Sequence, residues 1–222
     1  MVAPSPAMTL ADIGNRAGTR AIARLNPGKA PNGKLPVLLD PRVSGGMIGH
    51  LLGAIAGPAI ARGTSFLLGK EDQMLFDSSI VIRDEPHRPR GLRSRAFDGE
   101  GLPTAARNLV EGGKITGWLL DTASAKQLGL APTGHASRGG GASGVGASNL
   151  NLAPGSVTPA ALMEGIADGV YITELIGHGI NPVTGDYSRG ASGFLIKDGA
   201  LAGPIAEFTI AGNLIDLSLI HI

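Results

Sequence analysis

The chain has 222 residues, of which 43% are hydrophobic and 17% charged, so it is long enough to bury a core and has the composition of a globular protein. It contains no cysteine, which excludes disulfides, thiolate metal sites and a cysteine nucleophile, and which fits a cytoplasmic protein. The net charge of +1 gives no reason to expect a nucleic-acid partner. No apolar run approaches the ~18 residues of a membrane span, so no membrane partner is expected either.

The first predicted element is an amphipathic helix that begins after Thr9. Thr9 and Asp12 have the spacing of a capping box, and apolar residues then recur at helical intervals as far as Leu25. A turn-rich linker over 27–34 leads to a short buried strand over 35–40. The first strand of a sheet is therefore expected only after residue 34.

A second helix is predicted over 47–61, with Ser44 as its N-cap. Its several internal glycines are poor helix formers, so this helix must be held by packing against a sheet. A strand over 75–83 follows, and a loop over 84–101 comes after it.

The start of that loop brings three potential metal ligands close together, namely Asp84, Glu85 and His87. Pro86 and Pro89 space them along an extended backbone, and several arginines surround them. This pattern favours an ion-paired surface loop over a metal site.

The middle of the chain alternates short elements with loops. A strand is predicted over 114–121, followed by a short helix that Thr122 caps and Gly129 ends. The Gly/Ser-rich segment 138–149 is predicted to be a loop, and Thr158 caps a helix that runs to about residue 168.

Strands dominate the last third of the chain. They are predicted over 170–176, 193–197 and 206–211, with Asp198-Gly199 as the turn of a hairpin between the last two. The predicted fold class is therefore α+β, with a mainly antiparallel, sandwich-like sheet and a few packed helices.

A loop rich in glycine separates the first two of these strands and carries His178, Asp186, Tyr187 and Arg189. Polar side chains held on a loop between strands are typical of a binding or catalytic surface, so these four residues are candidates for a substrate cleft. The alternative is turn architecture, in which Asp186 stabilises the turn and Arg189 pairs with Asp186.

The segment 176–194 resembles the signature of the TldD/PmbA family of cytosolic proteases, once called modulators of DNA gyrase, and specifically its PmbA (TldE) branch. Further matching segments occur in the family's order: 36–43, 61–67, 84–92, 118–125, 133–136 and 208–214. The resemblance implies that 1–34 is the tail of a missing N-terminal domain and that 35–216 is the family's C-terminal domain. Residues 217–222 depart from the family and are either a non-native tail or a terminal strand.

The resemblance also identifies a motif that this chain lacks. In the TldD branch, a helix after the Asp-Pro turn carries His-Glu-x-x-x-His, which binds a metal and supplies a general base. Those positions fall here on Gly49, His50 and Ala54, and one imidazole does not hold zinc. No metal is therefore expected in this chain. His50 is either a further substrate-cleft candidate or a helix histidine with a structural role.

The resemblance thus implies a metal-free PmbA/TldE-like subunit of a cytoplasmic heterodimeric metalloprotease. Its expected partners are a TldD-like subunit that carries zinc and a peptide or unfolded protein substrate. The alternative is a non-catalytic binding or regulatory protein that acts on a toxin–antitoxin or gyrase-related partner, which only the older family name favours.

Overall fold

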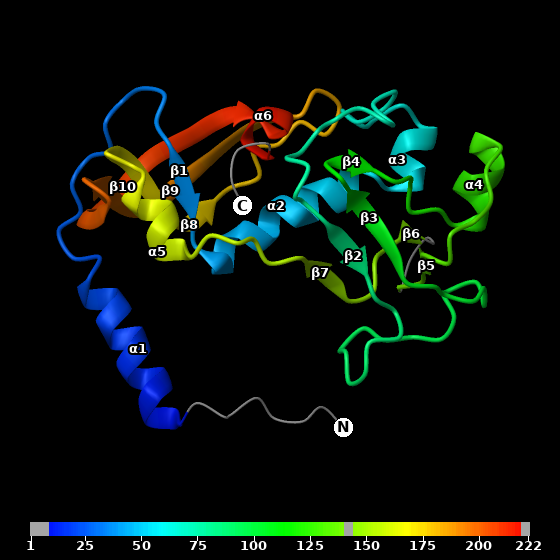
Figure 1. The fold of residues 1–222 in the computed structure, drawn as a ribbon, viewed down its shortest axis with the longest axis horizontal. Helices are drawn as coiled ribbons and strands as arrows, with labels where there is room; N and C mark the ends of the chain where they lie inside the picture. The colour runs from blue at the N-terminus through cyan, green and yellow to red at the C-terminus, as the bar shows by residue number, and fades with distance from the viewer. Residues whose placement is uncertain (1–8, 140–143, 219–222) are drawn as a thin grey trace.

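The computed structural model describes residues 9–139 and 144–218, and it has the predicted α+β architecture with mainly antiparallel sheets (Figure 1). Two four-stranded sheets lie at opposite ends of the molecule in Figure 1, and helix α2 runs between them. No helix in the described ranges is long and apolar enough to cross a membrane.

The first sheet, called here the long-stranded sheet, has the order β1-β8-β9-β10. Its strands are β1 (Val37–Leu39), β8 (Asp168–Ile176), β9 (Asp186–Lys197) and β10 (Ala200–Asn213). β1 pairs with β8 in parallel, and the other pairs are antiparallel. The predicted hairpin turn is confirmed, since Asp198 and Gly199 both have positive φ, 48° and 78°.

The second sheet, the short-stranded sheet, has the order β4-β3-β2-β7. Its strands are β2 (Ile82–Asp84), β3 (Arg107–Glu111), β4 (Lys114–Ile115) and β7 (Leu150–Leu152), and a two-stranded ribbon of β5 (Ala136–Ser137) and β6 (Gly144–Val145) lies nearby. The predicted strand over 114–121 is confirmed only at its first two residues, and β3 was not predicted.

The predicted strand over 75–83 was also mostly wrong, because only its last two residues belong to β2. Leu75 and Phe76 are buried, yet both of their backbone N–H groups donate to the single carbonyl of Gly113. An apolar run indicates burial, and burial does not require a ladder of strand hydrogen bonds.

The predicted second helix is two helices, α2 (Pro41–Ala54) and α3 (Gly57–Ala61), and its N-cap is Asp40 rather than Ser44. The Asp40 carboxylate accepts from the N–H of Arg42, and Pro41 fits the first helical position because it needs no donor there. The break follows from close packing, since a Cβ on Gly57 would lie 2.5 Å from the Ser124 Oγ.

The remaining helices are short except for the first: α1 (Leu10–Ile22), α4 (Thr122–Leu128), α5 (Pro159–Glu164) and α6 (Leu214–Ser218). Asp121, not Thr122, caps α4, and Gly129 ends it in the left-handed conformation as predicted. α6 was not predicted. The helix includes residues 217 and 218 of the expected tail. Three segments lie outside the described residues: 1–8, 140–143 of the predicted Gly/Ser loop, and 219–222.

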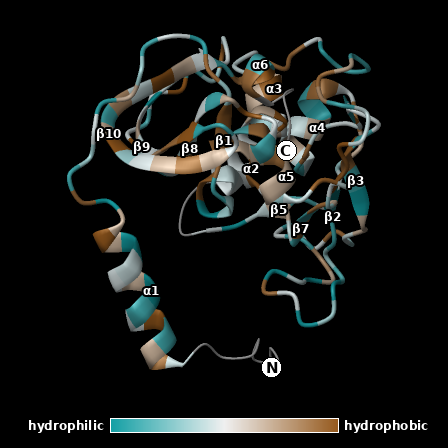
Figure 2. Ribbon diagram, turned by 60° about the vertical axis from the view of Figure 1, so that its left-hand side comes forward, coloured by the Kyte–Doolittle hydropathy of each residue, from teal (hydrophilic) through white to brown (hydrophobic). Residues whose placement is uncertain are grey.

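The α1 capping box between Thr9 and Asp12 is confirmed. The helix stands away from both sheets in Figure 2, where hydrophobic and hydrophilic bands alternate along it. None of its residues is buried, and Leu10 and Ile22 are 89% and 69% exposed.

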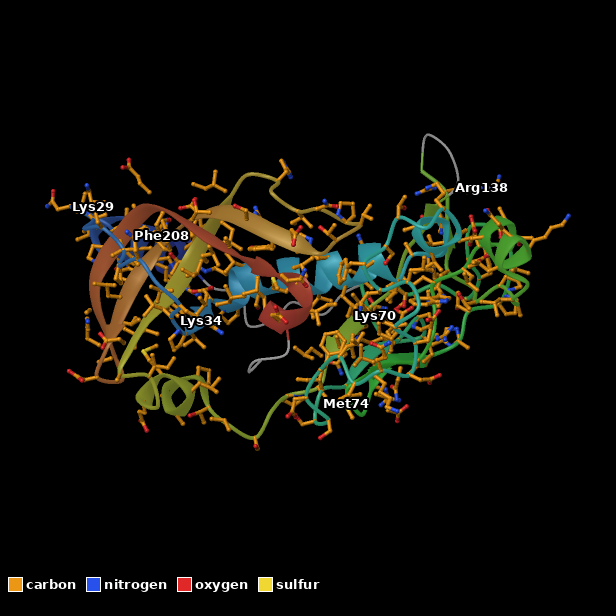
Figure 3. The ribbon with its side chains drawn as sticks, turned by 90° about the horizontal axis from the view of Figure 1, so that it is seen from above. Lys29, Lys34, Lys70, Met74, Arg138 and Phe208 are labelled. Carbon is orange, nitrogen blue, oxygen red and sulfur yellow. The ribbon has the colours of Figure 1, made fainter. Side chains whose placement is uncertain are left out.

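Two hydrophobic clusters form the core, one on each sheet. The first half of α2 packs on the long-stranded sheet through Val43 and Met47, and its second half packs on the short-stranded sheet through Leu51 and Ala54. In Figure 3, α2 runs from the part of the molecule that carries Lys34 and Phe208 toward the middle, where Lys70 is labelled. The glycine-rich α2 is therefore held by packing at both of its ends.

Candidate functional site

Strand β9 presents two of the predicted site residues on one face. Successive side chains of a strand point to opposite faces, so Tyr187 and Arg189 share the face that packs toward α2 while Asp186 and Ser188 share the other. Tyr187 is buried in the core of the long-stranded sheet, whereas Asp186 and Ser188 are exposed. The strand thus brings only half of the predicted loop residues toward α2.

His50 lies on α2 opposite these two side chains. Its ring meets the Tyr187 ring edge to face, with centroids 6.1 Å apart and an interplanar angle of 64°. Burial and the nearby Arg189 charge lower the pKa of His50, because both disfavour the imidazolium. His50 is therefore a neutral imidazole at pH 7, and its Nε2 is buried without a hydrogen-bond partner among the described residues.

Arg189 is half-buried and anchored at one end. Its Nη2 donates to the Leu175 carbonyl at 3.3 Å, while its Nε is buried and lacks a partner among the described residues. No carboxylate of the described ranges lies within 4.0 Å of this guanidinium. Burial raises the pKa of the Tyr187 phenol, and the Arg189 charge and hydrogen bond offset only part of that rise. The His50–Tyr187–Arg189 cluster is thus a site of one positive charge and two unsatisfied nitrogens.

One face of α2 beside this cluster is open. A Cβ built at the α2 glycines would meet nothing within 4 Å at any of four positions, namely Gly45, Gly46, Gly49 and Gly53. At 100° per residue these glycines fall on one side of the helix, and His50 lies at the border between that side and the buried side. The cluster is therefore next to an uncovered helix face.

The other side of His50 adjoins a small apolar cavity between the two clusters of the core. Its volume is about 30 Å³, and its walls include Met47, Leu51, Phe66 and Leu214. Such a volume holds about one water molecule, and the lining is apolar apart from His50, so this cavity is a packing gap rather than a ligand pocket.

His178 and Asp186 lie apart from the cluster. His178 is exposed in the loop, and Asp186 is the first residue of β9, where it accepts a hydrogen bond from the Thr184 Oγ1 at 2.6 Å. The predicted pairing of Arg189 with Asp186 is wrong, because residues three apart on a strand face opposite ways. The loop ends at Gly185 because β9 begins at Asp186, seven residues before the predicted strand over 193–197. Asp186 therefore belongs to the turn.

The side chains at this site do not fit a metal. In the TldD pattern, two positions bind the metal and a third supplies the general base. The two metal-binding positions are Gly49 and Ala54 here, and neither has a side-chain atom that could bind a metal ion. No group of three or more His, Asp or Glu side chains in the described ranges could hold a metal ion. His50 alone offers one ligand where catalytic zinc needs three.

Sequence reasoning missed a buried hydrogen-bonded pair of Asp84 and His135, and its description of Asp84 as part of a surface loop was wrong. The Asp84 carboxylate accepts from the His135 ring at 3.0 Å and from the N–H and hydroxyl of Ser148 at 2.8 and 2.5 Å, and Asp84 and His135 are each at most 2% exposed. Burial acts to raise the pKa of Asp84, but these hydrogen bonds outweigh it and hold the pKa below its usual value.

The position of this pair argues for a structural role. The other His135 nitrogen lies 2.8 Å from the Thr133 hydroxyl, so the pair joins the end of β2 to the 133–136 segment and to Ser148. His87, in contrast, is exposed and lies 3.1 Å from the Thr104 hydroxyl. The sequence signal was the occurrence of Asp84 and His135 in two separate matching segments.

Comparisons with known proteins place this geometry in a family. Residues 32–219 match the family model described as PmbA/TldA metallopeptidase C-terminal domain. The metalloproteases PmbA of Escherichia coli O157:H7 and its homologue in Haemophilus influenzae are each 38% identical, and the matches cover 92% of this chain and 44% of each relative. The chain thus spans less than half the length of these relatives.

Solved structures agree. A putative modulator of a DNA gyrase from Thermotoga maritima aligns with a TM-score of 0.87 and 30% identity, covering 98% of this chain and 50% of the other. TldE from Thermococcus kodakarensis aligns with a TM-score of 0.82 and 28% identity, covering 92% and 47%. The chain therefore belongs to the PmbA/TldD metallopeptidase family and carries its C-terminal domain.

Proposed function

We propose that this chain is the metal-free, PmbA/TldE-like subunit of a cytoplasmic heteromeric metalloprotease and that it binds peptides for a TldD-like partner. The observation that carries the proposal is the chemistry of α2, which has Gly49 and Ala54 where zinc ligands would stand and an open face beside His50. Such a helix can line a cleft, but it cannot activate water. Zinc in the partner would supply the nucleophile by lowering the pKa of its bound water.

A free sheet edge supports a role in binding extended peptides. β10 is the outer strand of the long-stranded sheet, and Gly28 is the one described residue that bonds to its outer edge, through the Pro204 carbonyl and the Ala206 N–H. The edge from Phe208 to Asn213 has no strand beside it in the described ranges. Exposed edges accept added strands, and Arg189 lies one strand away from this edge, opposite Ile210.

The experiment that tests the proposal is a peptidase assay on the chain alone, on a TldD-like metalloprotease alone and on their mixture. We expect hydrolysis of an unstructured peptide to require the mixture, and a chelator to abolish it. Hydrolysis by the purified chain alone would contradict the proposal. Stable assembly without any cleavage would favour a binding or regulatory function instead.

A further inference from the structure

We propose that the His50–Tyr187–Arg189 cluster binds a carboxylate group of the peptide, with the Arg189 guanidinium as the charge partner and His50 as a second donor. This inference rests on the proposed peptide-binding function and deepens it, because it names the group that the site recognises. It follows from the contacts that the cluster makes and from those that it lacks.

Arg189 has a charge with no counter-charge within 4.0 Å among the described residues, whereas Arg24 meets Glu174 at 3.1 Å and Arg42 meets Asp40 at 2.8 Å. Arg189 instead uses Nη2 on a backbone carbonyl and leaves its buried Nε–H without an acceptor. Buried donors are nearly always satisfied, so an unmet one beside an unpaired charge points to an absent anionic acceptor.

His50 supplies the second unmet nitrogen. A neutral imidazole carries one N–H, and with the proton on Nε2 it donates to an oxygen without adding charge. The Tyr187 ring projects from β9 and packs against the His50 ring, so it limits the rotation of the imidazole. One positive group and one neutral donor match the two oxygens and single charge of a carboxylate better than the double charge of a phosphate.

The open glycine face of α2 provides the approach. His50 lies at its border, and no Cβ at Gly49 or Gly53 would touch another residue. Because the Arg189 Nε is closed to solvent in this structure, a ligand arriving along this face reaches it only when the side chain turns.

The test compares three versions of one short unstructured peptide: with a free C-terminus, with a C-terminal amide, and with the amide plus one internal glutamate. Affinity for the full chain is measured by titration calorimetry. We expect the amidated peptide without glutamate to bind about tenfold more weakly than at least one of the two peptides that carry a carboxylate. This is the effect of losing one charge-assisted hydrogen bond. The two carboxylate versions distinguish a C-terminal site from a side-chain site.

Variants assign the effect to the cluster. Arg189→Ala should remove the preference for a carboxylate, and Arg189→Lys should retain part of it because the charge stays while the paired donors are lost. Arg62→Ala is the matched control, since Arg62 is an exposed arginine at the end of α3. Equal affinity of the wild-type chain for all three peptides would overturn the inference and leave the proposed function standing.

A second measurement does not depend on peptides. Acetate is titrated while the arginine Nε–H signals are followed by NMR, with the Arg189 signal identified by its loss in Arg189→Lys. We expect a saturable shift of that signal which His50→Ala weakens. Absence of the shift would overturn the carboxylate site even if peptides bind, whereas a shift without any peptide binding would count against the proposed function alone.

Discussion

At the scale of single residues, breaking the buried Asp84–His135 pair should cost more stability than breaking an exposed ion pair. Exposed pairs such as Lys197–Asp168 contribute little because water and salt screen them. Asp84 instead has three hydrogen bonds inside the protein and nearly no contact with water. Removing one partner leaves buried polar groups unsatisfied.

We therefore expect Asp84→Asn to lower the free energy of unfolding by about 3 kcal/mol or more, since an amide cannot accept all three bonds. The folded-state pKa of Asp84 lies below 3.8, so the stability it contributes is present above pH 3.8 and is lost as the pH falls further. Urea unfolding of both proteins should show a stability difference that narrows below this pH.

The control for that experiment is Glu111→Gln, which changes an exposed carboxylate of β3 and should alter stability by less than about 0.5 kcal/mol. The structural role of the Asp84–His135 pair would be contradicted if, at neutral pH, Asp84→Asn lowered the free energy of unfolding no more than Glu111→Gln does.

At the scale of elements, α2 and α3 depend on glycine for two different reasons. Gly57 is buried where α3 begins, and a Cβ there would lie within 2.8 Å of the Leu119 carbonyl as well as close to Ser124. Gly53 lies in α2 with open space around it. The first glycine is required by packing, and the second leaves a helix face bare.

These two positions make a matched pair of substitutions. Gly57→Ala should destabilise the protein by about 1–3 kcal/mol through overpacking. Gly53→Ala should stabilise it by up to about 1 kcal/mol, because alanine is the better helix former. Thermal melting of both variants measures the difference. A Gly53→Ala variant less stable than the wild type would show that another group covers this face of α2.

At the scale of the whole molecule, α2 joins two halves that each have their own sheet and core cluster. The His50–Tyr187–Arg189 cluster lies where the helix passes β9, so it depends on the docking of α2 against the long-stranded sheet. The cluster contains a single imidazole, which is fewer ligands than a catalytic zinc ion requires.

We accordingly expect the purified chain to contain no stoichiometric zinc, and His50→Ala to leave its metal content unchanged. Elemental analysis after mild chelation measures this, with a TldD-like metalloprotease treated in parallel as the control that retains its metal. Close to one metal per chain, retained through the same treatment, would contradict the expectation.

Local sequence patterns predicted the elements that local chemistry specifies. The capping box of Thr9, the Thr158 cap of α5, the left-handed Gly129 and the Asp198-Gly199 turn all follow from interactions within a few residues. His50 lies on a helix as predicted, and His178 lies on the predicted loop, but Asp186, Tyr187 and Arg189 lie in β9 rather than on that loop. The boundaries of 75–83 and 114–121 were wrong because apolar runs report burial without reporting hydrogen-bonded partners.

The sequence by itself determined the family, the α+β class and the lack of metal ligands at Gly49 and Ala54, because these depend on residue identity and short-range order. Only the tertiary structure decided which candidates meet. The two-residue alternation of β9 turns Tyr187 and Arg189 toward His50 and leaves Asp186 in its turn, and strand register is set by pairing with β8 and β10. The partnership of Asp84 with His135, 51 residues apart, was likewise decided by packing, because no local pattern encodes a contact at that separation.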